Sequence, residues 1–273
     1  MKNRFPVAGK SGKSRKSGAA GTRSLLEIVK KRFPMRKSKE LYAHILYGDV
    51  FVNGHRERNL SARISPDAEI TIAPTEKNYV SRGGHKLESI LRRAENAGFC
   101  YRNRVLLDAG ASSGGFTDCL LQHGAQTVHT VDVGYNQLDY RLRCDSRVQV
   151  HERCNIMSIS REDMQPCPEF AVADISFRTL SGVVPHILKI LCSDDPLLLA
   201  LIKPQFELEY SDIPVADFSG VLRDSSIIEG VLDNLIGRLR EEGVRVGGMW
   251  PSGLPGKKGN QEFFGLFSAQ DTQ

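Results

Sequence analysis

Four charged residues lie where apolar runs typical of buried strands come to an end. Asp108, Asp132, Asp174 and Lys203 each stand at or near the end of such a run. Because the carboxyl ends of parallel strands meet at one edge of a sheet, these side chains are expected to share a ligand site there. Carboxylates accept hydrogen bonds from hydroxyl groups, whereas a lysine can take up a proton or orient an oxygen lone pair. These residue types therefore suit a site that binds and activates hydroxyl groups.

A glycine-rich turn follows the first of these strands. Gly110, Gly114 and Gly115 are spaced as G-x-x-x-G-G, which differs from the dinucleotide-binding pattern G-x-G-x-x-G. The glycines leave room for a ligand to approach the backbone, and the helix expected at 115–123 would present its N-terminus to that ligand. The pattern is therefore consistent with a ligand-binding turn between a strand and a helix.

Two polar residues after the next strands indicate a nucleoside ligand. Asp132 ends the second strand, where a carboxylate can accept hydrogen bonds from both ribose hydroxyls. Asn155 follows the third strand, where a polar side chain can meet the edge of an adenine. We therefore expect these two residues to bind opposite ends of one adenosine group.

Strands and helices alternate through the larger, C-terminal part of the chain, which favours a mainly parallel sheet. The candidate strands are 104–109, 127–133, 148–152, 170–175, 197–203, 244–250 and 261–267. The candidate helices are 84–97, 115–123, 136–142, 178–192 and 224–242. Seven strands with a late hairpin-like pair predict an α/β fold of the Rossmann-like methyltransferase class.

The first quarter of the chain carries all the excess positive charge. Residues 1–22 hold six basic residues and no acid, and residues 23–75 hold ten basic and six acidic residues. Residues 76–273 hold 21 basic and 26 acidic residues. This distribution is typical of a polyanion-binding segment attached to a nearly neutral body. Since residues 1–22 are rich in Gly, Ser, Lys and Arg, we expect them to be a disordered tail.

Residues 23–73 are predicted to form a small α+β unit. One helix has its apolar face at Leu25–Val29, a second begins near Ser38, and Val50–Val52 is a short strand. The Asn53-Gly54 pair predicts a hairpin turn, from which a returning strand runs to Ile72. This unit resembles the S4-like RNA-binding domain. The basic residues expected to contact RNA are Lys30, Lys31, Arg32, Arg36, Lys37, Lys39 and, in the larger domain, Arg82.

The remaining boundaries and exclusions follow from composition. Residues 74–81 are expected to be a linker, 82–268 the larger domain and 269–273 a tail. The six cysteines include no C-x-x-C pair, so we expect free thiols and no metal site. No apolar run approaches the length of a membrane span, and the basic N-terminus lacks a signal-peptide core. We therefore expect a cytoplasmic protein without membrane association.

Five ordered segments of the larger domain resemble the TlyA family of S4-plus-methyltransferase proteins. They are Gly110–Thr117, Val131–Tyr135, Asp174–Phe177, Lys203–Glu207 and Gly259–Glu262. The resemblance covers about residues 23–268. Proteins of this family, often labelled hemolysins, methylate cytidine 2′-hydroxyls in ribosomal RNA.

The resemblance implies S-adenosylmethionine as the cofactor and ribosomal RNA or ribosomal subunits as the partner. It also implies a catalytic Lys-Asp-Lys-Glu tetrad made of Lys86, Asp174, Lys203 and Glu262. The expected cofactor contacts are Asp108, Gly110, Ser112, Gly114, Gly115, Phe116, Asp132, Asn155 and Asp174.

Within this tetrad Lys203 is the residue expected to act on the ribose hydroxyl, because it ends a very apolar strand. It would either accept the hydroxyl proton or orient an oxygen lone pair. Lys86 would disfavour the charged form of Lys203 by like-charge repulsion, while Asp174 and Glu262 would fix its orientation.

Three alternatives make different demands on the sequence. The first is a methyltransferase that acts on an RNA base. Such enzymes that target exocyclic amines tend to carry Asn/Asp-Pro-Pro-aromatic after the fourth strand, where this chain reads Asp-Ile-Ser-Phe at 174–177. A membrane-active cytolysin requires an amphipathic or spanning segment and export. An RNA chaperone that only binds RNA leaves the complete cofactor pocket without a role.

Overall fold

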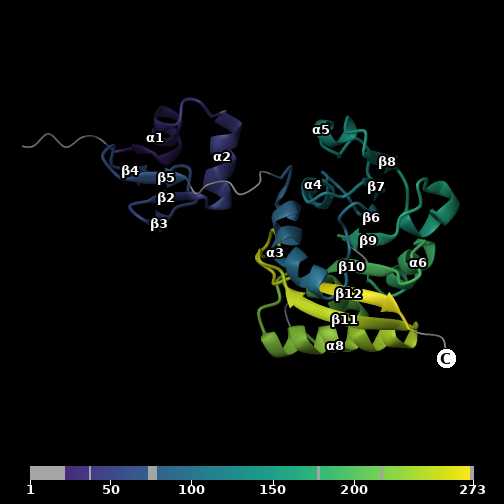
Figure 1. Ribbon diagram of the computed structural model, residues 1–273. Helices are drawn as coiled ribbons and strands as arrows, with labels where there is room; N and C mark the ends of the chain where they lie inside the picture. Colours follow the sequence, from purple (N-terminus) through teal and green to yellow (C-terminus); the bar gives the residue numbers. More distant parts are fainter. Residues whose placement is uncertain (1–21, 37, 73–78, 177–178, 216–217, 271–273) are drawn as a thin grey trace, which may run out of the picture. The chain divides into compact units, whose positions relative to one another are not determined.

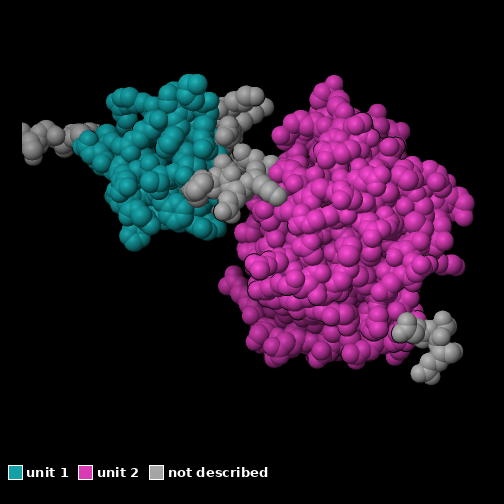
Figure 2. Space-filling view, in the orientation of Figure 1, with its two compact units in different colours: residues 1–78 teal, residues 79–273 magenta. Residues whose placement is uncertain are grey.

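The computed structural model describes residues 22–36, 38–72, 79–176, 179–215 and 218–270. The chain divides into two compact units, residues 1–78 and 79–273 (Figure 2). The predicted tail at 1–22 therefore lies almost wholly outside the described residues, as does most of the predicted linker at 74–81. Among the described residues, none of the helices combines the length and the apolar character that a membrane span requires.

The first unit packs two helices against short strands. Its elements are β1 (Arg23–Ser24), α1 (Leu25–Arg32), α2 (Ser38–Tyr47), β2 (Val50–Val52), β3 (His55–Arg56), β4 (Arg63–Ile64) and β5 (Ile70–Ile72). Ser24 and Glu27 form a reciprocal capping box, which fixes the start of α1. Leu25 and Val29 of α1 are fully buried against Ile45 of α2 and Val50 of β2. The predicted two-helix arrangement is confirmed.

The strand that returns from the hairpin turn was predicted to run on to Ile72, but the structure interrupts it. Asn53 and Gly54 both take positive φ, as the turn requires, but β3 ends at Arg56. The Glu57 carboxylate then accepts hydrogen bonds from the backbone N–H groups of the next two residues, which turns the chain away from the sheet. β5 pairs instead with the opposite edge of β2.

A seven-stranded sheet forms the centre of the second unit (Figure 1). Its strands are β6 (Val105–Ala109), β7 (Thr127–Asp132), β8 (Val148–Glu152), β9 (Phe170–Ala173), β10 (Leu197–Ile202), β11 (Val244–Pro251) and β12 (Phe263–Ala269). The order is β11-β12-β10-β9-β6-β7-β8, and only β12 runs antiparallel to its neighbours. The predicted α/β class is confirmed. The strand order reverses between β6 and β9, which is where such sheets bind ligands.

Helices cover both faces of this sheet (Figure 1). One face packs against α3 (Arg82–Asn96), α4 (Gly115–Gln122) and α5 (Tyr140–Arg143). The other packs against α6 (Val183–Ile190) and α8 (Ser225–Glu241). The remaining turns are α7 (Pro204–Glu207), η1 (Ile156–Ser158), η2 (Arg161–Asp163) and η3 (Leu208–Tyr210). Two apolar cores therefore hold the carboxyl edge of the sheet in place.

Two helices are shorter than predicted. The helix expected at 136–142 starts only after Asp139, whose side chain caps it, because Asn136 takes a φ of 57° that a helix cannot contain. The helix expected at 178–192 begins after Gly182, which takes a φ of 75°.

The last strand and the linker also differ from their predicted limits. The strand expected at 261–267 is displaced by two residues, so Glu262 precedes it and Ala269 ends it. Tyr79, expected in the linker, is buried in the core of the second unit.

Candidate active site

A cavity of about 530 Å³ opens at the carboxyl ends of β6 to β9. It is lined by Gly110, Ser112, Val131, Asp132, Val133, Gln137, Cys154, Asn155, Ile156, Asp174, Ile175, Ser176 and Val183. Its volume suits a nucleoside-sized ligand, and its wall is apolar with a few polar groups at defined positions.

The glycine turn after β6 brings the backbone against this cavity. Gly110 takes a φ of 83°, and a Cβ atom there would come within 2.7 Å of the Asp174 carbonyl oxygen. A side chain at this position would therefore force β6 and β9 apart as well as strain the backbone. Glycine is required here by the close approach of two strand ends.

The Asp132 carboxylate is held in place by two backbone donors. Its Oδ2 accepts a hydrogen bond from the Ser112 N–H and its Oδ1 from the Gly134 N–H, both at 2.7 Å. Since a carboxylate has about four lone-pair sites, each oxygen retains the capacity to accept a further hydroxyl. Asp132 is thus both a cavity wall and an oriented acceptor.

Asn155 marks the other side of the cavity. Its Oδ1 accepts a hydrogen bond from the Met157 N–H at 3.0 Å and opens the turn η1. The side-chain amide nitrogen remains as a donor beside Ile156 and Cys154. This combination of an amide edge and an apolar surface suits a heteroaromatic ring.

Asp108, which was predicted to contact the cofactor, is fully buried and is not among the residues that line the cavity. Its Oδ2 accepts hydrogen bonds from the Thr117 N–H (3.0 Å) and hydroxyl (2.6 Å), which ties β6 to α4. Burial raises the pKa of Asp108 to about 7, against the lowering effect of the Thr117 bonds and with a further rise from Asp174 and Asp132. Asp108 therefore fixes the two ends of the glycine turn, because it joins β6 to the first turn of α4.

Three more of the predicted cofactor residues lie outside the cavity lining. A Cβ at Gly114 would overlap side chains of α5 and its preceding loop, and one at Gly115 would overlap Ser81 and Gly84. The Phe116 ring packs 5.8 Å from that of Phe264. Gly110, Ser112, Asp132, Asn155 and Asp174 are the predicted residues that do line the cavity.

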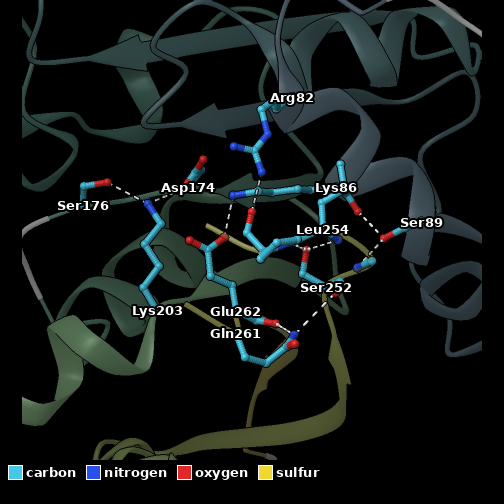
Figure 3. Close-up of polar contacts among 12 residues, drawn as sticks. Arg82, Lys86, Ser89, Asp174, Ser176, Lys203, Ser252, Leu254, Gln261 and Glu262 are labelled. Atoms are coloured by element: carbon cyan, nitrogen blue, oxygen red, sulfur yellow. Dashed lines mark hydrogen bonds and ion pairs between the residues drawn. The ribbon is translucent and has the colours of Figure 1, made fainter. Parts of the chain in front are cut away.

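Lys203 and Asp174 form an ion pair at the rim of this cavity (Figure 3). The Lys203 Nζ lies 2.5 Å from Asp174 Oδ1 and donates a hydrogen bond to the Ser176 hydroxyl at 2.6 Å. Asp174 follows β9 and Lys203 follows β10, and the parallel register of these strands brings their ends together. Ser176 was missed from the sequence, because nothing in its spacing indicates a lysine contact.

A second ion pair joins Lys86 of α3 to Glu262 (Figure 3). The Lys86 Nζ donates to Glu262 Oε2 at 2.5 Å, and the two residues are only 9% and 3% exposed. The antiparallel register pairs Ile202 with Phe263, so Glu262 stands at the same end of the sheet as Lys203. All four tetrad residues are therefore drawn from neighbouring chain segments at one edge.

This arrangement differs from the predicted one in how charge is distributed. Lys86 was expected to act on Lys203 by repulsion, but each lysine faces its own carboxylate. The site thus consists of two neutralised pairs, one deeply buried and one at the cavity rim.

The residues predicted to bind RNA fall into two groups. Lys30 and Lys31 are exposed on the last turn of α1. The Arg32 guanidinium donates to the carbonyls of Pro66 and Ala68, and that of Arg36 contacts His44. Arg82 donates to the Pro255 carbonyl at 2.6 Å in the second unit. Lys37 and the side chain of Lys39 lie outside the described part of the chain.

Comparison with known proteins agrees with this geometry. Hemolysin A of Brachyspira hyodysenteriae is 39% identical over 224 residues, which cover 82% of this chain and 90% of the relative. The 16S/23S rRNA (cytidine-2′-O)-methyltransferase TlyA of Mycobacterium tuberculosis is 34% identical over 232 residues, 84% of each protein. The solved structure of a hemolysin-designated protein from Streptococcus thermophilus has a TM-score of 0.67 and 33% identity, and covers 93% of this chain and 90% of that one.

The sheet order, the cavity at its reversal point and the two lysine–carboxylate pairs all lie within residues 79–268, the segment that matches the FtsJ-like methyltransferase family. On this match and these relatives, the chain belongs to the FtsJ-like methyltransferases.

Proposed function

We propose that this protein methylates the 2′-hydroxyl of cytidine in ribosomal RNA, with S-adenosylmethionine as the methyl donor. The observation that carries the proposal is the Lys203–Asp174 ion pair, because Asp174 also lines the nucleoside-sized cavity. The pair therefore connects the donor site to the place where an acceptor hydroxyl must arrive. The nucleotide specificity is supported by the named activity of the TlyA relative.

The cavity lining fits an adenosine-bearing donor. Asp132 is oriented to accept the ribose hydroxyls, and Asn155 with Ile156 suits the adenine. The backbone at Gly110 allows the methionine end to lie against the strand ends near Asp174. When bound there, S-adenosylmethionine supplies a methyl group on a positively charged sulfur, and its transfer to a hydroxyl oxygen releases one proton.

Lys203 is placed to orient the acceptor oxygen. An ammonium has three N–H donors; one of them binds the Ser176 hydroxyl, while the positive charge is paired with the Asp174 carboxylate. We assign another N–H to the ribose 2′-oxygen, which directs an oxygen lone pair toward the methyl group and leaves the hydroxyl proton free to pass to water. Positioning of this kind lowers the barrier by removing the entropy cost of aligning the two groups.

Lys86 and Glu262 fix the segments that surround Lys203. Their ion pair is buried and links α3 to the residue before β12, so it holds these two elements together near Lys203. We assign them a positioning role in the same tetrad.

The first unit is proposed to be an S4-like RNA-binding domain. Its support is the exposed basic turn at Lys30 and Lys31, together with the basic pocket formed by Arg23, Lys31 and Arg32. Cationic side chains of this kind bind phosphates without reading sequence. We also propose that the protein acts in the cytoplasm, because its proposed substrate is ribosomal RNA.

The test is to incubate the full-length protein with methyl-labelled S-adenosylmethionine and separated ribosomal subunits, then map the label. We expect label on a cytidine 2′-oxygen in one or both subunits, and none with Lys203→Ala. Label on a base would contradict the proposal. So would the absence of label from both subunits after incubation with the wild-type protein.

A further inference from the structure

The loop between β11 and β12 carries two adjacent lysines at its turn. Lys257 and Lys258 occupy the centre of a turn in which the Gly259 N–H donates to the Gly256 carbonyl at 3.0 Å. Gly259 takes a φ of 91°, which closes the turn, and the Gly256 N–H donates to the Asn260 carbonyl at 2.9 Å. Both lysine side chains are exposed.

Contacts from other segments hold this loop on both sides. On one side, α3 contributes the Arg82 bond to the Pro255 carbonyl and a bond from the Gly253 N–H to the Ser89 hydroxyl (Figure 3). On the other, the buried Asn260 side chain accepts from the Leu222 N–H and donates to the Gly220 carbonyl, both at 2.9 Å. The turn is therefore presented at a fixed position.

That position is next to the buried Lys86–Glu262 pair. A Cβ atom at Gly256 would come within 2.4 Å of Glu262 Oε1, so the backbone of the turn touches the carboxylate that binds Lys86. Lys257 is the next residue. The two lysines therefore directly follow the residue that packs against the Lys86–Glu262 pair.

The turn has unused donors. Among the described residues, no carboxylate pairs with Lys257 or Lys258, and no group accepts a hydrogen bond from their backbone N–H groups. The adjacent acid, Glu262, is already neutralised by Lys86. Leu222 donates its N–H to the Asn260 side chain, and the next residue, Arg223, adds another exposed cation. Exposed ammonium and backbone N–H groups on one turn form a site for a phosphate.

We propose that the Lys257–Lys258 turn binds the phosphate backbone of the unpaired RNA strand that carries the target ribose. The inference rests on the proposed function, since an RNA acceptor brings phosphates within one nucleotide of the reacting hydroxyl. The contact positions the acceptor within the methyltransferase unit itself, in addition to any binding by the first unit.

The test compares two charge-matched variants of the full chain. One is Lys257→Gln with Lys258→Gln. The control is Lys189→Gln with Arg240→Gln, which removes the same charge from the last turns of α6 and α8. Both control residues are exposed. They lie at the helix ends that are far from the site, because each helix runs antiparallel to the strand that follows it.

We expect the Lys257/Lys258 variant to raise the KM for RNA about tenfold and to reduce the slope of log affinity against log salt by about 1.4, as expected for two contacts to a single strand. The single-turnover rate at saturating RNA should stay near the wild-type rate, and the Lys257→Arg, Lys258→Arg variant should restore affinity. Affinity for S-adenosylmethionine should match wild type in all variants, which verifies that they fold.

Unchanged KM and salt slope, or the same changes in the control variant, would overturn the inference. A fall in the saturated rate with unchanged KM would also overturn it, because the lysines would then act through Glu262. If the wild-type protein methylates no ribosomal RNA, the proposed function fails instead, and RNA binding by the two variants still tests the turn.

Discussion

The Lys86 ammonium lies 2.5 Å from the Glu262 carboxylate, although 176 residues separate them in the chain. The pair is buried and joins the first turns of α3 to the residue before β12. Breaking one partner of a buried ion pair leaves a charge without a counter-ion, whereas replacing both with apolar groups is often neutral. This asymmetry allows the structural contribution of the pair to be measured apart from the role in methyl transfer that we propose for it.

Glu262→Ala should lower the free energy of unfolding by about 3–5 kcal/mol, because Lys86 is then buried alone. The double variant Lys86→Met, Glu262→Leu should recover most of that stability but not the methylation rate. Denaturant unfolding and single-turnover methylation measure the two quantities. A stable single variant, or an active double variant, would show that the pair does not have these roles.

Lys203→Ala should reduce the single-turnover rate by about 10²–10⁴-fold while binding of RNA and S-adenosylmethionine stays within about threefold. Lys203→Arg should be similarly slow, since a planar guanidinium cannot reproduce short contacts to both Asp174 and Ser176. The rate is measured at saturating RNA and donor. A wild-type rate for Lys203→Arg would indicate that Lys203 only binds phosphate. A near-wild-type rate for Lys203→Ala would show that Lys203 has no part in the reaction.

Asp132→Ala should weaken binding of S-adenosylmethionine by about 10- to 100-fold, the loss expected for hydrogen bonds to a charged group. Asp132→Asn should fall between wild type and alanine, because it keeps one acceptor oxygen. Titration calorimetry gives the affinities. Asp145→Ala is the control, since it removes a partly exposed aspartate paired with Arg147 at the other end of the sheet. Equal affinities for Asp132→Ala and the control would exclude the ribose contact.

Asp108 should make stability depend on pH. Its folded-state pKa of about 7 lies above the ordinary value of 3.8, so the folded protein keeps a proton that the unfolded chain loses. The contribution of Asp108 is full below about pH 4, declines as pH rises toward 7 and is constant above that, with a change on the order of a few kcal/mol. Relative to Asp108→Asn, wild type should lose unfolding free energy between pH 4 and pH 7. Parallel pH curves would contradict the assignment.

The basic residues of α1 should differ in whether they affect RNA binding or stability. Lys30→Gln with Lys31→Gln should flatten the salt dependence of RNA binding and leave stability unchanged, because both side chains are exposed. Arg32→Gln should lower stability by about 0.5–1.5 kcal/mol, because its guanidinium donates to two backbone carbonyls. RNA binding at several salt concentrations and thermal unfolding distinguish the two. The opposite pattern would reverse the roles.

Much of the fold was determined by local sequence. Apolar runs ending in polar residues located all seven strands of the large sheet to within a few residues, and Asn53-Gly54 located the hairpin turn. Periodicity and turn chemistry act over a few residues, so they are readable without knowledge of neighbours. The same local signals placed Asp132 and Asn155 at strand ends, where both line the cavity.

The tertiary structure decided which side chains meet. Strand register pairs Lys203 with Asp174 and leaves Lys86 to Glu262, a division that spacing along the chain does not encode. Asp108 looked like a cavity residue, yet its position within β6 buries it against α4. Charge partners and burial are set by contacts between residues far apart in sequence, whereas a sequence pattern fixes only where each residue lies on its own element.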